Sequence, residues 1–503
     1  MTFDEHNSAH NSEHKPSLDV LFNRNTPDYY LNNTLSTNAT FKRSDFFTTD
    51  NDRDMRQHGK IDFANISDSF FWRRRIGRNI WRLNVMANYN MSPHADLTVT
   101  DSNNPEATAT QTVSSRSLNA RINAGTDFVL DYWRISLPFT INYANDRVES
   151  ELMTTGDSND LNGHNAKLSV SPSFEYTSPN KRVELRGSLE AAFSAIHARN
   201  RADGKKIGYN RPHLNPNARL KYIFSPSFNI TLSSGYSHST GDILDLMTAP
   251  VMTSWRTQSA RSGILARSKS FTSSMLFDYR KPFDFLFVNG SVSYSRSSRN
   301  QLNAQQVSSS DVVVSSLGLD SHSRSTSASA NVTKQFPSIG LKATIGGRYS
   351  WSANEMMQQE KIIPFYGQSV AANTRITLAP WRWTELQLSA NWSRTFNRYL
   401  SVRESYIMTS GNGHLSIYPA RGWDLFGEIE FVRKQLSDGN YKSMSLFDVG
   451  VSYKFSSFKL YLRAENLLNT RSYDYSIYNG LDTYSYSYRL RPRAYTVGIT
   501  FTR

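Results

Sequence analysis

The sequence predicts an all-β protein that crosses a membrane as an antiparallel β-barrel, and two observations predict it. Apolar and polar residues alternate over long stretches along the whole chain. Because successive side chains of a strand point to opposite faces, each stretch has one apolar and one polar face. The stretches also come in pairs joined by very short turns, as β-hairpins do. Long hairpins with one apolar face are typical of a transmembrane β-barrel.

The alternating stretches have the length that a membrane requires. A tilted barrel strand needs about nine to eleven residues to cross the hydrocarbon layer, whereas a soluble strand usually ends after about five or six. In residues 183–195 the apolar face runs for seven positions, with Glu184, Arg186 and Glu190 on the other face. Similar alternations occupy residues 81–89, 135–143, 341–351, 447–455 and 458–464.

Composition agrees with this geometry. The mean hydropathy is −0.54 and no apolar run approaches eighteen residues, which excludes a helical membrane protein. Aromatic residues make up 13% of the chain and suit the girdles of a barrel. A soluble all-β protein is an alternative. A propeller is another, but it needs four short strands per repeat, whereas each repeat here holds two long ones.

The formal net charge is +14 and the pI is near 9.6, values that raise the question of nucleic acid. The basic residues do not form one stripe, and we expect no nucleic-acid partner. One group crowds a turn: Arg73, Arg74, Arg75 and Arg78. Another occupies the polar register of strands, which suits a lumen: Arg82, Arg121, Lys167, Arg186, Arg219 and Arg348. The chain has no cysteine, so it has no disulfides.

Connections of two lengths alternate along the chain. The short ones fall at residues 24–28, 73–79, 129–133, 178–181, 225–228, 281–284, 336–339, 380–383, 419–422 and 455–458. The longer, more polar ones include residues 98–114, 241–262 and 297–321. Outer-membrane barrels have short periplasmic turns and long extracellular loops, so we expect the first set to face the periplasm.

A strand count suggests that the barrel is incomplete. Ten short turns imply twenty strands, and the last stretch, from about residue 486 to 502, makes twenty-one. Bacterial single-chain barrels have an even number, so about 21 of an expected 22 strands are present. Residues 1–16 are polar and His-rich and contain no secretory signal. We expect them to form an extracellular loop, with the barrel over residues 17–503, in an N-terminally truncated chain.

The end of the chain resembles that of TonB-dependent outer-membrane receptors. The resemblance lies in residues 464–470 (AENLLNT), a tyrosine-rich loop, residues 490–493 (LRPR) and the final alternation of Tyr495, Val497, Ile499 and Phe501. In particular, the chain is similar to the outer-membrane β-barrel family common in Bacteroidota. A weaker likeness covers Tyr279-Arg280-Lys281-Pro282 and residues 287–295.

This resemblance implies a barrel of twenty-two strands preceded by a plug domain that carries the segment bound by TonB. Neither the plug nor that segment has a counterpart in these 503 residues. The expected partners are outer-membrane lipid, the TonB complex through the absent plug, and the assembly machinery through the C-terminal strand. The expected location is the outer membrane.

Aromatic loop residues are the candidates for solute binding, since they could stack on a sugar or siderophore. They are Trp255 and Arg256 in the 241–262 loop, and Tyr473, Tyr475, Tyr478 and Tyr484 in the last loop. The tyrosines could equally form an aromatic girdle. His6, His10 and His14 recur every four residues, but without an apolar face we expect a disordered loop rather than a metal site.

No catalytic motif stands in its expected setting, so we expect neither an enzyme nor a cofactor. Glu428 and Glu430 share the polar face of one strand, as carboxylates lining a lumen would. The sequence therefore predicts a transporter that imports a scarce, bulky solute. The alternative is a passive porin or structural barrel without a plug. The solute itself cannot be deduced from the chain.

Overall fold

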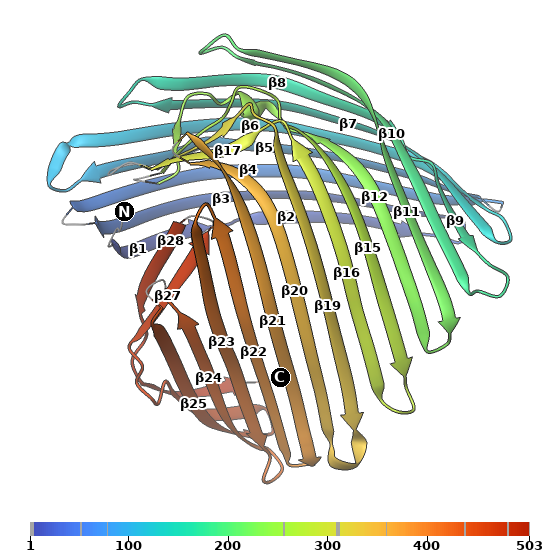
Figure 1. The fold of residues 1–503 in the computed structure, drawn as a ribbon, viewed down its shortest axis with the longest axis vertical. Coiled ribbons are helices and arrows are strands. Elements are labelled where there is room, and N and C mark those ends of the chain that lie inside the picture. The colour runs from blue at the N-terminus through green and yellow to red at the C-terminus, as the bar shows by residue number, and fades with distance from the viewer. Residues whose placement is uncertain are drawn as a thin grey trace.

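The computed structural model describes residues 5–50, 53–77, 79–254, 257–307, 312–358, 360–436, 439–479 and 482–501. Its regular elements are strands apart from two short 3-10 helices, which confirms the all-β class. No helix in this described part is long and apolar enough to cross a membrane. Figure 1 shows one strongly curved sheet, coloured from blue at the N-terminus to red at the C-terminus.

The elements follow one another without a second domain between them. The first half contains β1 (Glu5–His14), β2 (Ser17–Asn25), β3 (Tyr29–Asp50), β4 (Arg53–Ile76), β5 (Asn79–Asp101), β6 (Asn104–Val129), β7 (Trp133–Leu152), β8 (Asp157–Val170), β9 (Ser173–Thr177), β10 (Val183–Asn200), β11 (Lys206–Ser225), β12 (Phe228–Thr240), η1 (Ile243–Leu246), β13 (Val251–Met252) and β14 (Thr257–Ala260). The second half contains β15 (Arg267–Lys281), β16 (Leu286–Arg299), β17 (Leu302–Val307), β18 (Val312–Leu317), β19 (Ser321–Phe336), η2 (Pro337–Ile339), β20 (Leu341–Gln358), β21 (Lys361–Trp381), β22 (Thr384–Tyr399), β23 (Val402–Ile417), β24 (Trp423–Gln435), β25 (Tyr441–Phe455), β26 (Phe458–Glu465), β27 (Ser472–Asn479), β28 (Asp482–Arg489) and β29 (Ala494–Phe501).

Twenty-seven strands belong to one sheet, and β27 and β28 form a separate hairpin. Four of the twenty-seven, β13, β14, β17 and β18, are short pieces within loops. Two pairs, β1 with β2 and β8 with β9, are each a single strand that is interrupted. The described sheet therefore has twenty-one long strands, each antiparallel to its neighbours. This agrees with the number that the turns predict.

Both interruptions occur at prolines, which have no N–H to donate to a ladder. The first is at Lys15 and Pro16, and there the Pro16 carbonyl still accepts from Ala39 N at 3.0 Å. The second is at Ser171 and Pro172, opposite Pro138 of β7. Ser171 N donates to the Pro138 carbonyl at 3.0 Å, so the backbone stays largely paired across the gap.

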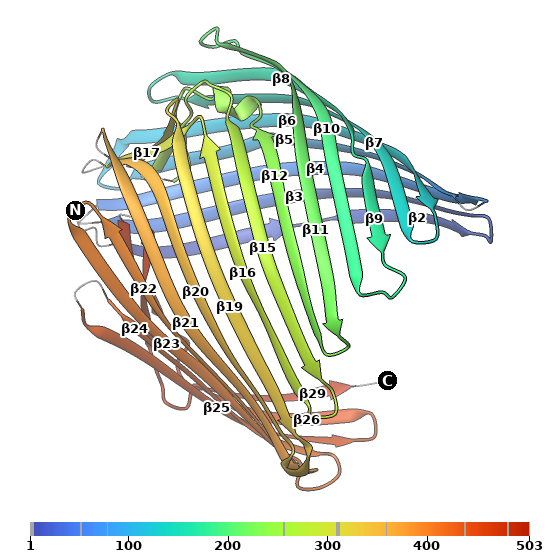
Figure 2. The same ribbon diagram turned by 45° about the vertical axis from the view of Figure 1, so that its right-hand side comes forward.

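The short connections all lie at one end of the strands, which we call the turn end, and the others lie at the loop end (Figure 2). Each of the ten predicted short turns joins two successive long strands. Gly340, between β19 and β20, has a φ of +62°, which glycine adopts without strain. A Cβ there would lie 2.0 Å from the Ala379 carbonyl oxygen, so this turn also needs glycine for space.

Two expectations for the loop end are wrong. Residues 98–114 are not a loop, because β5 and β6 remain paired up to Asp101 and Asn104. Residues 5–14, expected to be disordered, form β1 and pair with residues 41–50 of β3. The reason is the same in both cases: a ladder is made by backbone groups and continues through polar Thr, Ser and Asn side chains. Strands of 22 to 26 residues, such as β3, β4 and β6, therefore extend well past the length of a membrane.

The two faces of the sheet differ as the alternation predicts. One face, the outer face, exposes large apolar side chains that include Trp81, Leu137, Val292, Ile345 and Leu388. The opposite, inner face is polar, and serines hydrogen-bond across it from strand to strand, as Ser293 and Ser327 do at 2.7 Å. An apolar outer face on strands of this length defines an integral outer-membrane protein of the β-barrel class.

Replacing Val292 by arginine tests this assignment of faces. Val292 lies on the outer face of β16, and its neighbour Ser293 lies on the inner face. An arginine facing lipid near the bilayer midplane costs about 2–4 kcal/mol, whereas an inner position tolerates the charge. We expect Val292→Arg to reduce the folded, membrane-inserted fraction strongly and Ser293→Arg to change it little, as measured by heat-modified mobility on SDS gels. Equal behaviour of the two variants would contradict the register.

Cysteine labelling tests which end faces outside. The chain has no cysteine, and both Ser102 at the loop end and Ser456 at the turn end are exposed hairpin serines. We predict that a membrane-impermeant maleimide labels Ser102→Cys on intact cells and labels Ser456→Cys only after the outer membrane is permeabilised. Labelling of Ser456→Cys on intact cells would reverse the orientation.

Candidate functional site

The inner face carries paired charges along its length. Arg463 of β26 contacts Asp448 of β25 at 2.8 Å, Glu465 at 3.3 Å and Glu428 of β24 at 3.9 Å. Glu428 therefore lines the inner face opposite an arginine. Equivalent pairs cross the N-terminal strands, where Lys167 contacts Glu190 at 2.6 Å and Arg43 contacts Asp62 at 2.8 Å. The wall is thus polar but largely neutralised.

The buried Asp127 is the most enclosed of these charges. Its side chain is 1% exposed and lies close to the turn end of β6. It accepts from Arg82 at 2.5 Å, from Arg134 at 2.7 Å and from the Ser136 hydroxyl at 2.5 Å. Two arginines and a hydroxyl thus compensate the desolvation of this carboxylate, which links β5, β6 and β7.

At the loop end, residues 241–266 fold back against the inner face, and we call this segment the docked loop. Figure 1 shows it, in green and yellow-green, gathered with the other loop segments beside β6 and β8. Ile243 and Leu246 of η1 are 2% and 0% exposed, and they pack with Leu161 of β8 and Ala198 of β10. Leu161 is six residues from Lys167 on an unbroken ladder, so both side chains are on the inner face.

A second apolar contact holds the far end of the docked loop. Met252 of β13 packs with Val99 of β5 and Leu152 of β7, and all three are buried. Leu152 pairs with Gln111 of β6, in the same register as the polar inner residues further down these strands. The inner face therefore changes from polar to apolar at the loop end, where the docked loop covers it. Burying each of Ile243, Leu246 and Met252 contributes about 1.5–3 kcal/mol.

Buried amide side chains fix the docked loop through its backbone. Asn159 Nδ2 donates to the Ala249 carbonyl and its Oδ1 accepts from Ala249 N, both at 3.1 Å. Asn200 Nδ2 donates to the Leu246 carbonyl at 3.2 Å, and Gln111 Oε1 accepts from Met252 N at 3.3 Å. These three amides are 2% exposed or less. Because buried loop backbone needs partners, they make docking of an irregular segment possible.

The connection between β16 and β19 adds a second layer to this assembly. Gln301 is 1% exposed and donates to the Ile264 carbonyl at 2.6 Å and to the Ser262 hydroxyl at 3.2 Å. The strand β14 of the docked loop also pairs in parallel with β18 of this second connection. The two long connections between strands thus form one folded unit at the loop end.

Two carboxylates of the loop end respond oppositely to their surroundings. Burial raises the pKa of Asp245, whose Oδ2 accepts from Ala266 N at 2.8 Å within the docked loop. Burial would also raise the pKa of Asp203, but hydrogen bonds from the Thr248 hydroxyl and from Lys205 N, with the Lys205 charge, lower it. Charging Asp245 therefore disfavours docking, whereas the ionised Asp203 accepts from Thr248 at 2.6 Å and favours it.

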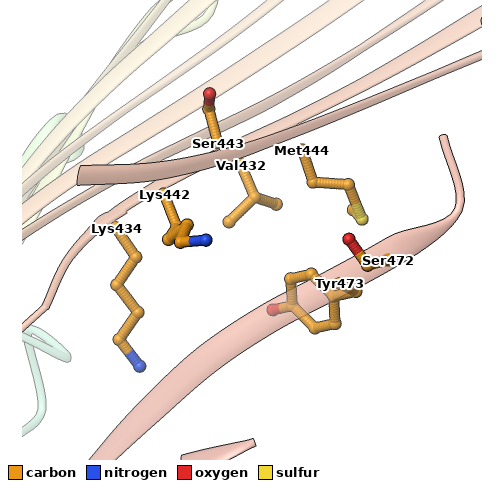
Figure 3. Close-up of a pocket in the computed structure, with 7 residues that line it drawn as sticks. All are labelled: Val432, Lys434, Lys442, Ser443, Met444, Ser472 and Tyr473. Atoms are coloured by element: carbon orange, nitrogen blue, oxygen red, sulfur yellow. The ribbon is translucent and has the colours of Figure 1, made fainter. Parts of the chain in front are cut away.

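The predicted solute-binding tyrosines lie elsewhere, in the hairpin of β27 and β28. Tyr473 and Ser472 face Val432, Lys434, Lys442, Ser443 and Met444 of β24 and β25 across a cavity of about 210 Å³ (Figure 3). Tyr475 and Tyr478 are in β27 and Tyr484 is in β28, where the description covers only the backbone. Trp255 and Arg256 lie outside the described residues. Solute binding by these residues stays a prediction.

The docked loop and its anchors were not predicted from the sequence. One signal was present: Ile243-Leu244-Asp245-Leu246 is an apolar run within a long polar connection. Its partners Gln111, Asn159 and Asn200 gave no such signal, because polar residues are ordinary on an inner face. Within the described part of the chain, no group of His, Cys, Asp and Glu residues is placed to hold a metal ion.

Comparison with known proteins gives likenesses of structure only. No known family and no curated protein matches the sequence. The copper transporter OprC matches at 11% identity with a TM-score of 0.48, over 98% of this chain and 79% of that one. The ferric citrate transporter FecA matches at 10% identity with a TM-score of 0.48, over 98% and 77%. The FrpB iron transporter from Neisseria meningitidis matches at 11% with a TM-score of 0.45, over 98% and 80%. At these values the likenesses assign no function.

A glycine variant tests the docking of the loop. A Cβ on Gly163 of β8 would lie 2.6 Å from Ile243 Cγ2 and 2.8 Å from Ala198 Cβ. Overpacking of this kind typically costs about 1–3 kcal/mol, so Gly163→Ala should displace the docked loop. We expect trypsin to cleave after Arg261 several times faster than in the parent chain, as measured by mass spectrometry of timed digests.

The control for this experiment is Gly208→Ala in the adjacent β11, where the nearest atom to an added Cβ is 3.9 Å away. This variant should be digested at the parental rate. If Gly163→Ala is cleaved no faster than Gly208→Ala, Ile243 does not pack against Gly163.

Proposed function

We propose that this chain is the barrel of a TonB-dependent outer-membrane transporter that imports a scarce, bulky solute. The observation that supports this most is the size of the sheet, because twenty-one long strands with a polar inner face enclose far more than a small solute needs. A lumen of that width requires a plug to remain a permeability barrier. The resemblance of residues 464–470 and 490–493 to TonB-dependent receptors supports the same proposal.

The proposal includes one further strand and a plug domain. Twenty-one antiparallel strands leave the first and the last running in the same direction, and no ladder joins β29 to β1 or β2 within the described residues. One strand of opposite direction would pair with both edges and close the barrel. The energy-coupling segment would belong to the plug and would contact TonB.

A passive porin or structural barrel is the second candidate, and the docked loop favours it. An inward-folded loop narrows a wide mouth without a plug, and the loop here is held by buried apolar contacts and amides. The two candidates differ in how a large antibiotic enters. A passive barrel admits it whether or not TonB is present, whereas a plugged transporter excludes it.

The test compares two chains in cells that lack other large pores. One is this chain with an added signal peptide, and the other also carries a plug and one upward strand before residue 1. We expect only the second to give a heat-modifiable barrel, since an unpaired edge in lipid costs several kcal/mol per backbone group. That form should exclude vancomycin and should bind the periplasmic domain of TonB in a pull-down assay.

The opposite result is equally clear. If the first chain inserts as a closed, heat-modifiable barrel and admits vancomycin in cells with or without TonB, the argument from strand direction fails. The passive barrel is then the better assignment.

A further inference from the structure

A groove on the inner face of β5, β6, β7 and β8 has the features of a solute-binding site. It has a volume of about 450 Å³ and is built from two adjacent cross-strand rows. The first row contains Met86, Arg121, Asn142 and Lys167, which are successive ladder partners. The second row contains Asn88, Asn119, Ala144 and Asn165. We call these eight residues the interior groove.

Arg121 is the only cation of the interior groove whose charge the wall does not neutralise. Lys167 contacts Glu190 at 2.6 Å, and Glu190 also accepts from Asn215 at 2.7 Å. By contrast, no described residue forms a hydrogen bond or ion pair with the Arg121 guanidinium. Other inner-face arginines, such as Arg43, Arg82 and Arg463, each contact a carboxylate. The free guanidinium at the centre of the groove is therefore unusual for this wall.

Amide side chains surround Arg121. Asn142 is its ladder partner, and Asn119 and Asn165 lie in the next row. In the described part of the chain, neither Asn142 nor Asn165 uses its side chain in a hydrogen bond. Each free amide offers two N–H donors and a carbonyl acceptor. Donors and acceptors that alternate around one cation suit hydroxyl or amide groups next to a carboxylate.

The docked loop bounds the groove towards the loop end. Gly163 and Ala198, against which Ile243 packs, form the next ladder row beyond Asn165 and Ile196. The apolar foot of the loop thus ends where the amide rows begin. A solute that passes the docked loop meets Arg121 and its amides directly afterwards.

We propose that the interior groove binds the carboxylate of a solute rich in hydroxyl or amide groups, with Arg121 holding the carboxylate. A guanidinium forms two parallel hydrogen bonds to a carboxylate, which lysine cannot do. This proposal rests on the proposed function for one point, that the inner face lies along the path of a solute. With a plug present, the solute contacts the groove while passing between plug and wall.

Calorimetric titration of the refolded full chain in detergent micelles tests the proposal. The probes are trigalacturonate and trialanine, which carry the carboxylate on a sugar or on a peptide, with maltotriose and trialanine amide as their neutral counterparts. We expect one carboxylate probe to bind and its neutral counterpart to bind at least about tenfold more weakly. Arg121→Gln should weaken the binding about tenfold or more, because hydrogen bonds to charged groups contribute about 1.5–3 kcal/mol.

The matched control is Arg116→Gln. Arg116 lies on the same strand, and its odd spacing from Arg121 places it on the outer face above the expected membrane span. It should bind the probe within twofold of the parent chain. Asn142→Ala gives a second variant in the groove in case Arg121→Gln folds poorly, and we expect it to weaken binding several-fold. The circular dichroism spectrum reports the folding of each variant.

Each outcome decides the question. Binding of trigalacturonate alone assigns the groove to acidic carbohydrate, and binding of trialanine alone assigns it to a peptide carboxyl terminus. No binding of either probe, equal binding of charged and neutral probes, or an equal loss in Arg116→Gln overturns the proposal. If the groove binds as expected but the TonB experiment fails, the groove belongs to a passive barrel.

Discussion

Pairing of the backbone inside a membrane is the constraint on which the rest of this structure depends. Hydrocarbon offers no partner to an N–H or C=O group, so every strand that crosses it must be hydrogen-bonded on both sides. The chain meets this with long antiparallel ladders, and it tolerates prolines only where a carbonyl is still used. Pro172 and Pro138 face each other at one interruption, and their carbonyls accept from Leu189 N and Ser171 N, each at 3.0 Å. The side chains are then free to vary, provided that they alternate.

The same alternation serves two environments along one strand. In β7, Asn142 and Leu152 are ten residues apart and share the inner face, but one faces the open lumen and the other is covered by the docked loop. In β8, Lys167 pairs with a glutamate while Leu161 is fully buried. The inner face thus holds a polar path and an apolar seat for the loop. The boundary between them is the row of Gly163, where the lack of a Cβ makes room for Ile243.

Local signals in the sequence predict the strands and turns because barrel strands repeat a simple period. All ten short turns lie where proline, glycine or asparagine interrupts the alternation. The extent of the strands at the loop end could not be predicted, since Thr98–Asp101 and His10–His14 have no apolar face and still form ladders. The docked loop was beyond reach for another reason. Its contacts join residues far apart in sequence, as Met252 N and Gln111 are, and nothing local marks Gln111 as a partner.

The two free edges of the sheet show why a second copy of this chain is a poor candidate to complete it. The outer-face residues of β29 are unusually exposed, with Val497 at 75% against 41% for Val292 inside the sheet, because no strand lies beside them. Leu18 and Phe22 of β2 are similarly exposed, at 62% and 57%. Both edge strands run from the loop end to the turn end. Two copies inserted in the same orientation would therefore bring parallel strands together, which pair less well and interrupt an otherwise antiparallel sheet. A single strand of opposite direction meets the geometry of both edges at once, and its side chains would need to alternate in the register that Val497 and Leu18 define.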